Sequence, residues 1–221
     1  MTDVLGSVRE SLKAREADNR LVPLVSSGKA PLSVFALAAA EESHIVPSDW
    51  RAFLTLAARA SEPNARRFFS VLSDGERLSL DLLPGLAAAG GFSPAELAAY
   101  EPMAGCQAYP SFVAWLALNA SPADVVVAMS SNFAAWGGYC GAIASAMRSQ
   151  YGLDSPATAF FDFFAGPAPE LEELAVAAVD AAVETGSLSG QAPRYARLFQ
   201  SYELMFWNTI ADADSQDEGH R

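Results

Sequence analysis

Apolar residues recur at intervals of three and four along most of the chain, which is the period of helices with one buried face. The stripe from Leu171 to Val179 has acidic residues on its opposite side, and a second stripe runs from Leu198 to Trp207. Signals for β-strands are scarce. The pattern predicts an all-α chain with helices at about 2–18, 32–46, 48–60, 62–89, 94–100, 103–119, 122–150, 156–165, 167–186 and 190–212, some of which merge into longer helices.

Capping residues mark where several of these helices begin. Ser93–Glu96 has the sequence of a capping box with proline at the first helical position, and Ser121–Asp124 repeats it with aspartate in place of glutamate. Ser48–Trp50 is a further candidate start. No linker, low-complexity tract or repeat divides the chain. We expect residues 1–213 to form a single helical domain and residues 214–221 to form a polar C-terminal tail.

The charge of the chain limits its partners. The sequence has 26 acidic and 14 basic residues, a formal net charge of −12, and Arg66-Arg67 is its only pair of adjacent Lys or Arg residues. Such a field repels nucleic acid and anionic membrane surfaces, so we expect neither as a partner. Only two cysteines are present, Cys106 and Cys140, and the N-terminal residues lack the apolar core of a secretion signal. We therefore expect a cytoplasmic protein with reduced thiols.

Two consecutive segments, Met103–Ala123 and Val125–Met147, contain no charged residue. The second could span a membrane by its length, but its polar residues favour a helix buried inside the bundle. Both segments carry polar groups that need partners when buried. Either they bond one another in the core, or they line an internal pocket for a small molecule. The polar residues in question are Gln107, Tyr109, Asn119, Asn132 and Tyr139.

The inventory of chemically active residues is small. The sequence has only two histidines, His44 and His220, too few for a histidine metal site, and it has no glycine-rich phosphate-binding motif. We expect no metal and no cofactor. The remaining candidates are carboxylates embedded among apolar residues, namely Glu41, Glu42 and Glu203. Each is either a solvated position on a helix or a buried group whose pKa is raised by desolvation.

Four short motifs resemble the TenA/thiaminase II family in their order and spacing. That resemblance covers most of the chain, from about Phe35 to Trp207, and the final motif is the most specific. It implies a haem-oxygenase-like multi-helix bundle that holds no haem and has an internal pocket for an aminopyrimidine. It also implies a homo-oligomer, a dimer or a tetramer. The motifs are Phe35-x5-Glu41-Glu42, Ala108-Tyr109-Pro110-Ser111-Phe112, Ser131-Asn132-Phe133-x2-Trp136 and Glu203-x2-Phe206-Trp207.

The resemblance also implies roles for individual residues. Glu42 stands where the family has its pyrimidine-binding aspartate, and Glu203 matches the late glutamate that manages protons as a general acid and base. The other implied ligand-binding residues are Tyr109, Asn132, Trp136 and Phe160, where Trp136 and Phe160 replace tyrosines. Ile45 replaces a further tyrosine.

Asn132 is the main departure from the family pattern, because it occupies the position of the nucleophilic cysteine. The lone pair of an amide nitrogen is delocalised, so it cannot attack a ring as a thiolate does. Covalent thiaminase chemistry is therefore not expected at this position. Cys140, eight residues further along the predicted helix 122–150, and Cys106 are distant substitutes for the nucleophile.

Three functions follow from these observations. The first is a hydrolase or lyase that needs no cysteine, with Glu203 as its general acid and base. The second is a non-catalytic protein that binds a small molecule and has a regulatory role. The third, a di-iron oxidase of the haem-oxygenase-like class, needs more histidines than the chain has.

Overall fold

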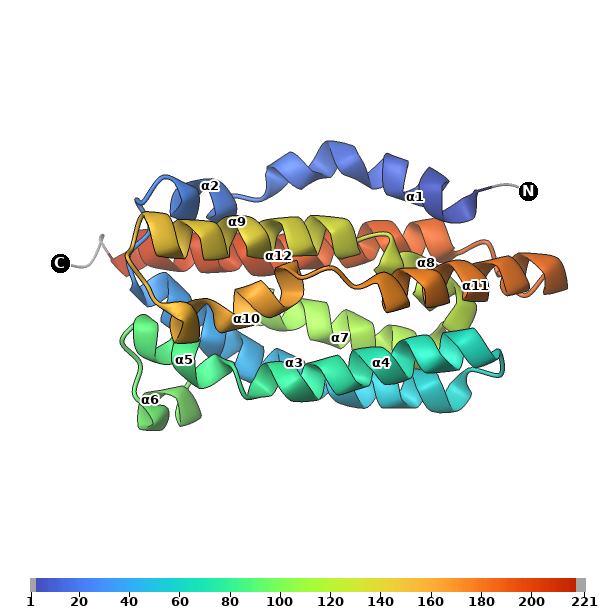
Figure 1. The fold of residues 1–221 in the computed structure, drawn as a ribbon, viewed down its shortest axis with the longest axis horizontal. Helices are drawn as coiled ribbons and strands as arrows, with labels where there is room; N and C mark the ends of the chain where they lie inside the picture. The colour runs from blue at the N-terminus through green and yellow to red at the C-terminus, as the bar shows by residue number, and fades with distance from the viewer. Residues whose placement is uncertain (1–2, 218–221) are drawn as a thin grey trace.

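The computed structural model describes residues 3–217, and those residues form a bundle of helices without a strand (Figure 1). The all-α prediction is thus confirmed. In chain order the elements are α1 (Val4–Leu12), the short 3₁₀ helix η1 (Lys13–Asp18), α2 (Leu21–Ser26), α3 (Ser33–Arg59), α4 (Pro63–Leu80), α5 (Leu83–Ala89), α6 (Pro94–Ala98), α7 (Ala104–Asn119), α8 (Pro122–Ser130), α9 (Phe133–Ser149), α10 (Ser155–Ala165), α11 (Pro169–Thr185) and α12 (Ala192–Asp217).

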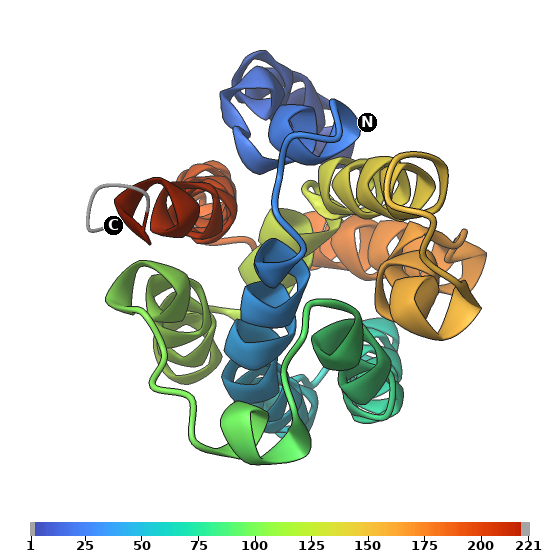
Figure 2. The same cartoon turned by 90° about the vertical axis from the view of Figure 1, so that its left-hand side faces the viewer.

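Helix α3 lies near the middle of the bundle when the molecule is viewed end-on (Figure 2). It packs against α4, α5 and α7, while α12 packs against α7 and α8, and α9 against α10. The buried apolar side chains form two clusters, one with Phe53, Phe68 and Val126 and the other with Phe35, Ile143 and Trp207. Tyr109 of α7 packs against both clusters and therefore marks where they meet.

The two predicted capping sequences behave differently. Ser93 and Glu96 form the predicted capping box, in which each side chain bonds the backbone N–H of the other. Ser121 begins α8 without a capping bond from its side chain, and Asp124 turns away from the helix end. The buried carboxylate of Asp124 instead accepts hydrogen bonds from the backbone N–H, at 3.2 Å, and the hydroxyl of Ser189. Asp124 therefore fixes the loop between α11 and α12.

The predicted helix 122–150 is in fact two helices, α8 and α9, that separate at Ser131 and Asn132. Three consecutive polar side chains explain the break, because each bonds the carbonyl four residues earlier. The Ser130 hydroxyl donates to Val126 O at 2.6 Å, the Ser131 hydroxyl to Val127 O at 2.7 Å, and Asn132 Nδ2 to Ala128 O at 3.0 Å. These bonds occupy the carbonyls of the last turn of α8, and the next helix starts in a new direction.

Other boundaries also depart from the prediction. The predicted helices 32–46 and 48–60 merge into α3, which continues through Pro47, whereas the predicted helix 62–89 divides into α4 and α5. Helix α2 was not predicted, and residues 13–18 are 3₁₀ rather than α-helical. Helix α12 extends beyond residue 212 to Asp217, so the expected tail 214–221 begins as helix and its last four residues lie outside the described part.

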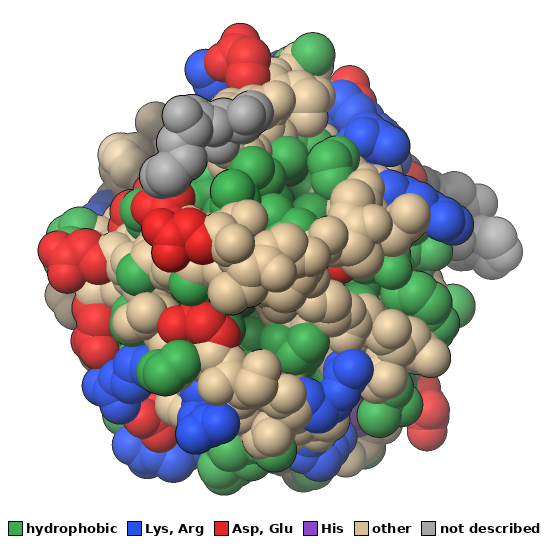
Figure 3. Space-filling model, turned by 90° about the vertical axis from the view of Figure 1, so that its right-hand side faces the viewer, with side chains coloured by type: hydrophobic (Ala, Val, Ile, Leu, Met, Phe, Trp, Pro, Cys, Tyr) green, Lys and Arg blue, Asp and Glu red, His purple; other side chains and the backbone are tan. Residues whose placement is uncertain are grey.

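The two uncharged segments also differ in burial. Every residue of α8 from Asp124 to Ser130 is buried, as expected for the centre of the bundle. Helix α7 does not meet that expectation, because Trp115 is 46% exposed and Leu118 is 70% exposed. None of the helices described is both long and apolar enough to span a bilayer. On the end of the molecule drawn in Figure 3, Lys and Arg side chains are dispersed among acidic ones rather than gathered in a patch.

Candidate functional site

A cavity of about 1070 Å³ opens where the two hydrophobic clusters meet. Its walls come from α3, α4, α7, α12, the α8–α9 junction and the segment that joins α10 to α11. Its volume is at the upper end of the range typical of small-molecule sites. Aromatic side chains form much of the wall, namely Phe53, Phe133, Trp136, Phe163, Phe164, Phe199 and Phe206.

Helix α3 presents one continuous face to this cavity. Glu42, Ile45, Asp49 and Phe53 all line it, and their spacing of three and four residues places them on the same side of a helix. Glu42 is 5% exposed and Asp49 is 3% exposed. The face thus alternates acidic and apolar side chains, and it places two buried carboxyl groups on the wall of a largely apolar cavity that opens to solvent.

Burial changes the acidity of both groups. It raises the pKa of Asp49 to about 8, although a hydrogen bond from Tyr109 acts in the opposite direction. It raises the pKa of Glu42 well above its usual value, and the neighbouring Asp49 and Glu41 raise it further. Asp49 Oδ1 is buried and accepts no hydrogen bond. Asp49 therefore tends to retain a proton at neutral pH.

Helix α4 adds a third carboxyl group to the same side of the cavity. Glu76 is half-buried and lines the cavity. Its pKa is raised well above the usual value by burial first, then by Asp49 and Glu42. Asp49 raises the pKa of both Glu42 and Glu76, and Glu42 raises that of Glu76, so these carboxyl groups do not titrate independently.

Glu203 reaches the cavity from α12 and is 2% exposed. Burial raises its pKa to about 8, with the Trp207 side chain acting in the opposite direction. Burial raises the pKa of the Tyr109 hydroxyl, and so do four nearby acids, namely Asp49, Glu203, Glu76 and Glu42. All four acids therefore affect the ionisation of Tyr109. A carboxyl group with a pKa near neutrality can both donate and accept a proton, which suits general acid–base catalysis.

Asn132 lines the cavity from the junction of α8 and α9, where it directly precedes the first residue of α9. Its Nδ2 donates to Ala128 O at 3.0 Å and to Ala196 O at 3.4 Å, which ties the junction to α12. Its Oδ1 is buried without a hydrogen-bond partner. The side chain thus has one acceptor that a ligand with an N–H or O–H group could satisfy.

Of the six residues that the sequence analysis predicted for the site, the structure brings five to the cavity. They are Glu42, Tyr109, Asn132, Trp136 and Glu203. Phe160 does not line the cavity. It is buried and packs edge-on against Phe164, with ring centroids 5.1 Å apart, and Phe164 provides the cavity wall in its place.

The cysteines lie outside the cavity. Cys106 is buried and donates from Sγ to Phe206 O at 3.8 Å. Cys140 is also buried. It lies on α9, which begins after Asn132, so it is not on the same helix as the residues of α8. Burial and nearby glutamates raise the pKa of both thiols. Neither is placed or activated to replace a nucleophile at position 132.

The remaining candidates from the sequence lie away from the cavity. Glu41 is buried in a set of hydrogen bonds on another side of α3, and His44 is exposed. His220 lies outside the described residues. No group of three His, Cys, Asp or Glu residues within residues 3–217 has an arrangement that could hold a metal ion.

Asp49 and Glu76 are the functional candidates that sequence reasoning missed. The spacing of seven residues between Glu42 and Asp49 gives two helical turns and was a usable signal. Asp49 was instead interpreted as part of a helix start at Ser48–Trp50. Glu76 lies in a charged stretch of α4 that looks like a solvated face in the sequence.

The described helices form a haem-oxygenase-like bundle, since solved structures with that fold align with almost the whole chain. A TenA family transcription regulator from Silicibacter sp. TM1040 aligns with a TM-score of 0.71 at 15% identity, over 94% of this chain and 96% of that one. A domain of unknown function with a haem oxygenase-like fold from Shewanella denitrificans OS217 aligns with a TM-score of 0.69 at 12% identity, over 96% and 91%. A TenA homologue from P. horikoshii OT3 aligns with a TM-score of 0.67 at 17% identity, over 94% and 96%.

The model of the TENA/THI-4/PQQC family matches residues 20–212, so this chain belongs to that family. The resemblance read from the four motifs is thereby confirmed. No curated protein matches the sequence closely enough to count as a relative.

Proposed function

We propose that this protein binds a small amino-substituted heterocycle, similar to the aminopyrimidines of thiamin salvage, in the acidic cavity. The observation that carries the proposal is that Glu42, Asn132 and Glu203 line one cavity and that all three are buried. Carboxylates and an amide oxygen accept hydrogen bonds from ring amino groups, and aromatic walls stack on planar rings. Membership of the family supports a thiamin-related role.

The proposed reaction is hydrolysis without a covalent intermediate. Glu203, protonated at neutral pH, gives its proton to the departing amine as the carbon–nitrogen bond breaks. A water oxygen forms the new bond to the same carbon, and the proton that this water loses returns to the Glu203 carboxylate. The sum is one water consumed and one amine released, with no oxidant or reductant. Glu42 holds the ring amino group while this occurs.

The absence of a cysteine at position 132 favours a second candidate, a non-catalytic binding protein. In that case the same cavity binds the heterocycle, Asn132 Oδ1 accepts a hydrogen bond from it, and no bond is broken. A regulatory role would then operate through ligand binding rather than through DNA, because a net charge of −12 repels a phosphate backbone.

Mass spectrometry after incubation with thiamin and aminomethylpyrimidines separates the two candidates. Conversion is expected, and Glu203→Gln is expected to lower it by about 10²- to 10⁴-fold, the usual contribution of a general acid or base. Asp81→Asn, which removes an exposed carboxylate just beyond α4, is the matched control and should leave conversion unchanged. Conversion that survives Glu203→Gln contradicts the catalytic role. A thermal shift with a heterocycle but no conversion supports the binding protein instead.

We also propose that the protein is cytoplasmic and forms a homo-oligomer, a dimer or a tetramer. Two free thiols suit a reducing compartment. Assembly is supported by the exposed apolar face of α7, where Trp115 lies beside Tyr195 and Tyr202 of α12 and Leu118 is exposed on the same helix. Single exposed apolar residues are normal, but a contiguous aromatic group at the surface is typical of an interface.

A further inference from the structure

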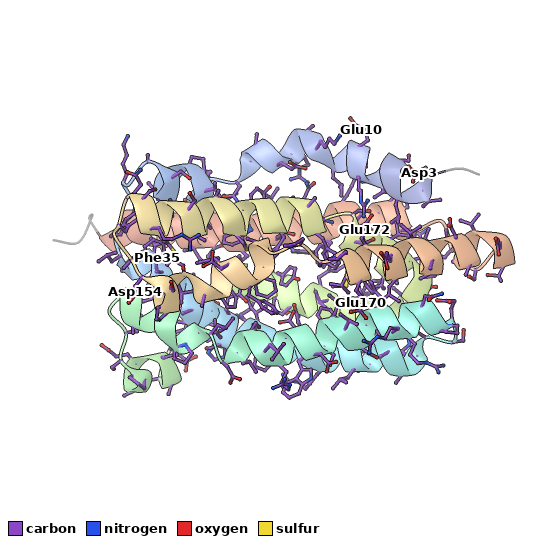
Figure 4. The ribbon with its side chains drawn as sticks, viewed as in Figure 1. Asp3, Glu10, Phe35, Asp154, Glu170 and Glu172 are labelled. Atoms are coloured by element: carbon purple, nitrogen blue, oxygen red, sulfur yellow. The ribbon has the colours of Figure 1, made fainter. Side chains whose placement is uncertain are left out.

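The cavity contains acids without matching bases. Among its described lining residues, Arg67 is the one basic side chain, and it lies at the rim, 57% exposed, where it pairs with Glu170 at 3.0 Å. Glu172, another rim acid, pairs with Arg9 at 2.7 Å. Figure 4 shows Glu170 on the side of α11 that faces α4 and Glu172 on the side that faces α1. Glu170 and Glu172 are therefore each paired with a cation, whereas Asp74 at the rim is exposed to solvent. The interior acids have no cation: Glu42, Asp49, Glu76 and Glu203.

Two buried oxygens on the cavity wall lack the hydrogen bonds that other buried acids have. Glu41 accepts three hydrogen bonds and Asp124 is bonded to Ser189. By contrast, Asp49 Oδ1 and Asn132 Oδ1 are buried and accept no hydrogen bond. A buried acceptor without a partner costs free energy, so the survival of these two oxygens on the cavity wall points to missing donors.

We propose that Asp49 and Glu76, together with Glu42, form a subsite for an ammonium group, and that the ligand of this cavity is an organic dication. One basic nitrogen lies between α3 and α4 at this subsite. The second lies at Glu203 and Asn132 Oδ1, and an apolar spacer contacts the aromatic wall between them. The inference rests on the proposed function in one respect, since it takes the same cavity as the ligand site. It adds a second contact for the ligand, the Asp49 and Glu76 subsite, which a neutral heterocycle does not use.

The chemistry of the wall fits such a ligand. An ammonium group has three N–H donors and no acceptor, which matches a subsite made of carboxyl oxygens alone. Trp136, Phe53 and Phe199 supply aromatic faces that attract cations as well as apolar chains. Tyr109 also lines the cavity, and Asp49, Glu203 and Glu76 all raise the pKa of its hydroxyl.

The charge state of the empty cavity is consistent with the same inference. Burial raises the pKa values of Asp49 and Glu203 to about 8, so these two acids keep protons at neutral pH, and it raises those of Glu42 and Glu76 well above the usual range. Arrival of a dication favours the ionised forms, and protons are released to solvent. The groups that face this cluster are Glu42, Asp49 and Glu41 on α3, Glu76 on α4, Tyr109 on α7, Glu203 on α12, and Asp74 and Arg67 at the rim.

Calorimetric titration with simple amines tests the proposal. The probes are a series of α,ω-diaminoalkanes, the monoaminoalkanes of equal length, and the corresponding diols. One diamine length is expected to bind about 10- to 100-fold tighter than its monoamine, because each end then makes a charge-assisted hydrogen bond, and the diols should not bind. Titration of that diamine in buffers of different ionisation enthalpy should show proton release.

Two variants assign the subsite. Asp49→Asn and Glu76→Gln should each remove most of the advantage of the diamine over the monoamine, whereas the control Asp81→Asn should preserve it. Glu76 is half-buried, so Glu76→Gln should fold even if Asp49→Asn does not. Glu76→Gln alone then tests whether the subsite binds the second amine. Equal binding of diamines and monoamines, or an advantage that survives both variants, overturns the proposal.

The failure of this proposal is distinguishable from failure of the proposed function. If an aminopyrimidine binds or is converted while diamines show no advantage, the dication subsite is wrong and the proposed function stands. If a diamine binds through Asp49 and Glu76 while no heterocycle binds, the subsite stands and the heterocycle is wrong.

Discussion

Glu41 and Glu42 are adjacent on α3 and both are buried, yet their carboxyl groups have opposite surroundings. Three donors reach Glu41: Tyr100 Oη and the backbone N–H of Met103, each at 2.7 Å, and Gln107 Nε2 at 2.9 Å. Glu42 lines the cavity and accepts no such bond. One glutamate therefore attaches the α6–α7 segment to α3, and its neighbour remains available to a ligand.

Substitutions at these two positions should change stability in opposite directions. Glu41→Ala removes the acceptor of three hydrogen bonds and leaves part-buried donors unpaired, so unfolding in urea should require about 1–3 kcal/mol less free energy. Glu42→Gln removes a carboxyl group that burial disfavours in its charged form, so the folded state should be as stable as the wild type or more so above neutral pH. Equal losses in the two variants would contradict the distinction.

Stability should fall as the pH rises from about 4 to about 8. The unfolded chain releases the protons of Asp49 and Glu203 near their ordinary pKa values, whereas the folded protein holds them until about pH 8. The folded state therefore binds more protons in that interval, and raising the pH favours the state that binds fewer. Thermal unfolding across the interval measures the effect. Asp49→Asn should flatten the curve, and an unchanged curve in that variant would mean that Asp49 ionises normally.

The fold could be predicted from the sequence because apolar residues recur at helical spacing along most of the chain and some helix starts have explicit capping signals, such as Ser93 with Glu96. The site could be predicted only in part. Asp49 follows Pro47, and a proline usually marks the start of a helix, so the sequence places Asp49 and Glu42 on different helices. The structure puts both residues on the same face of one helix, because α3 continues through Pro47. The break at Asn132 was missed because side-chain bonds to the preceding turn, rather than charge or proline, end α8.

Neither cysteine should react with an alkylating reagent in the folded protein. Cys106 and Cys140 are 0% exposed, and burial with nearby glutamates raises the pKa of both thiols, which suppresses the reactive thiolate. Mass spectrometry after iodoacetamide treatment should show no adduct at pH 8 and two adducts after denaturation. Rapid labelling of one cysteine in the native state would reopen the possibility of a thiol nucleophile.

The exposed face of α7 should decide the assembly state. Phe112 and Trp115 stack with ring centroids 6.0 Å apart, and Tyr195 of α12 lies edge-on to Trp115 at 5.9 Å, so the aromatic surface is continuous. Leu118, one turn further along α7, is 70% exposed. Leu118→Glu places a charge where a partner subunit would have to desolvate it, which costs little in the monomer and much in an interface. Light scattering should therefore show an oligomer for the wild type and a smaller species for the variant, with the helical circular dichroism unchanged. A variant that keeps the wild-type mass would place the interface elsewhere.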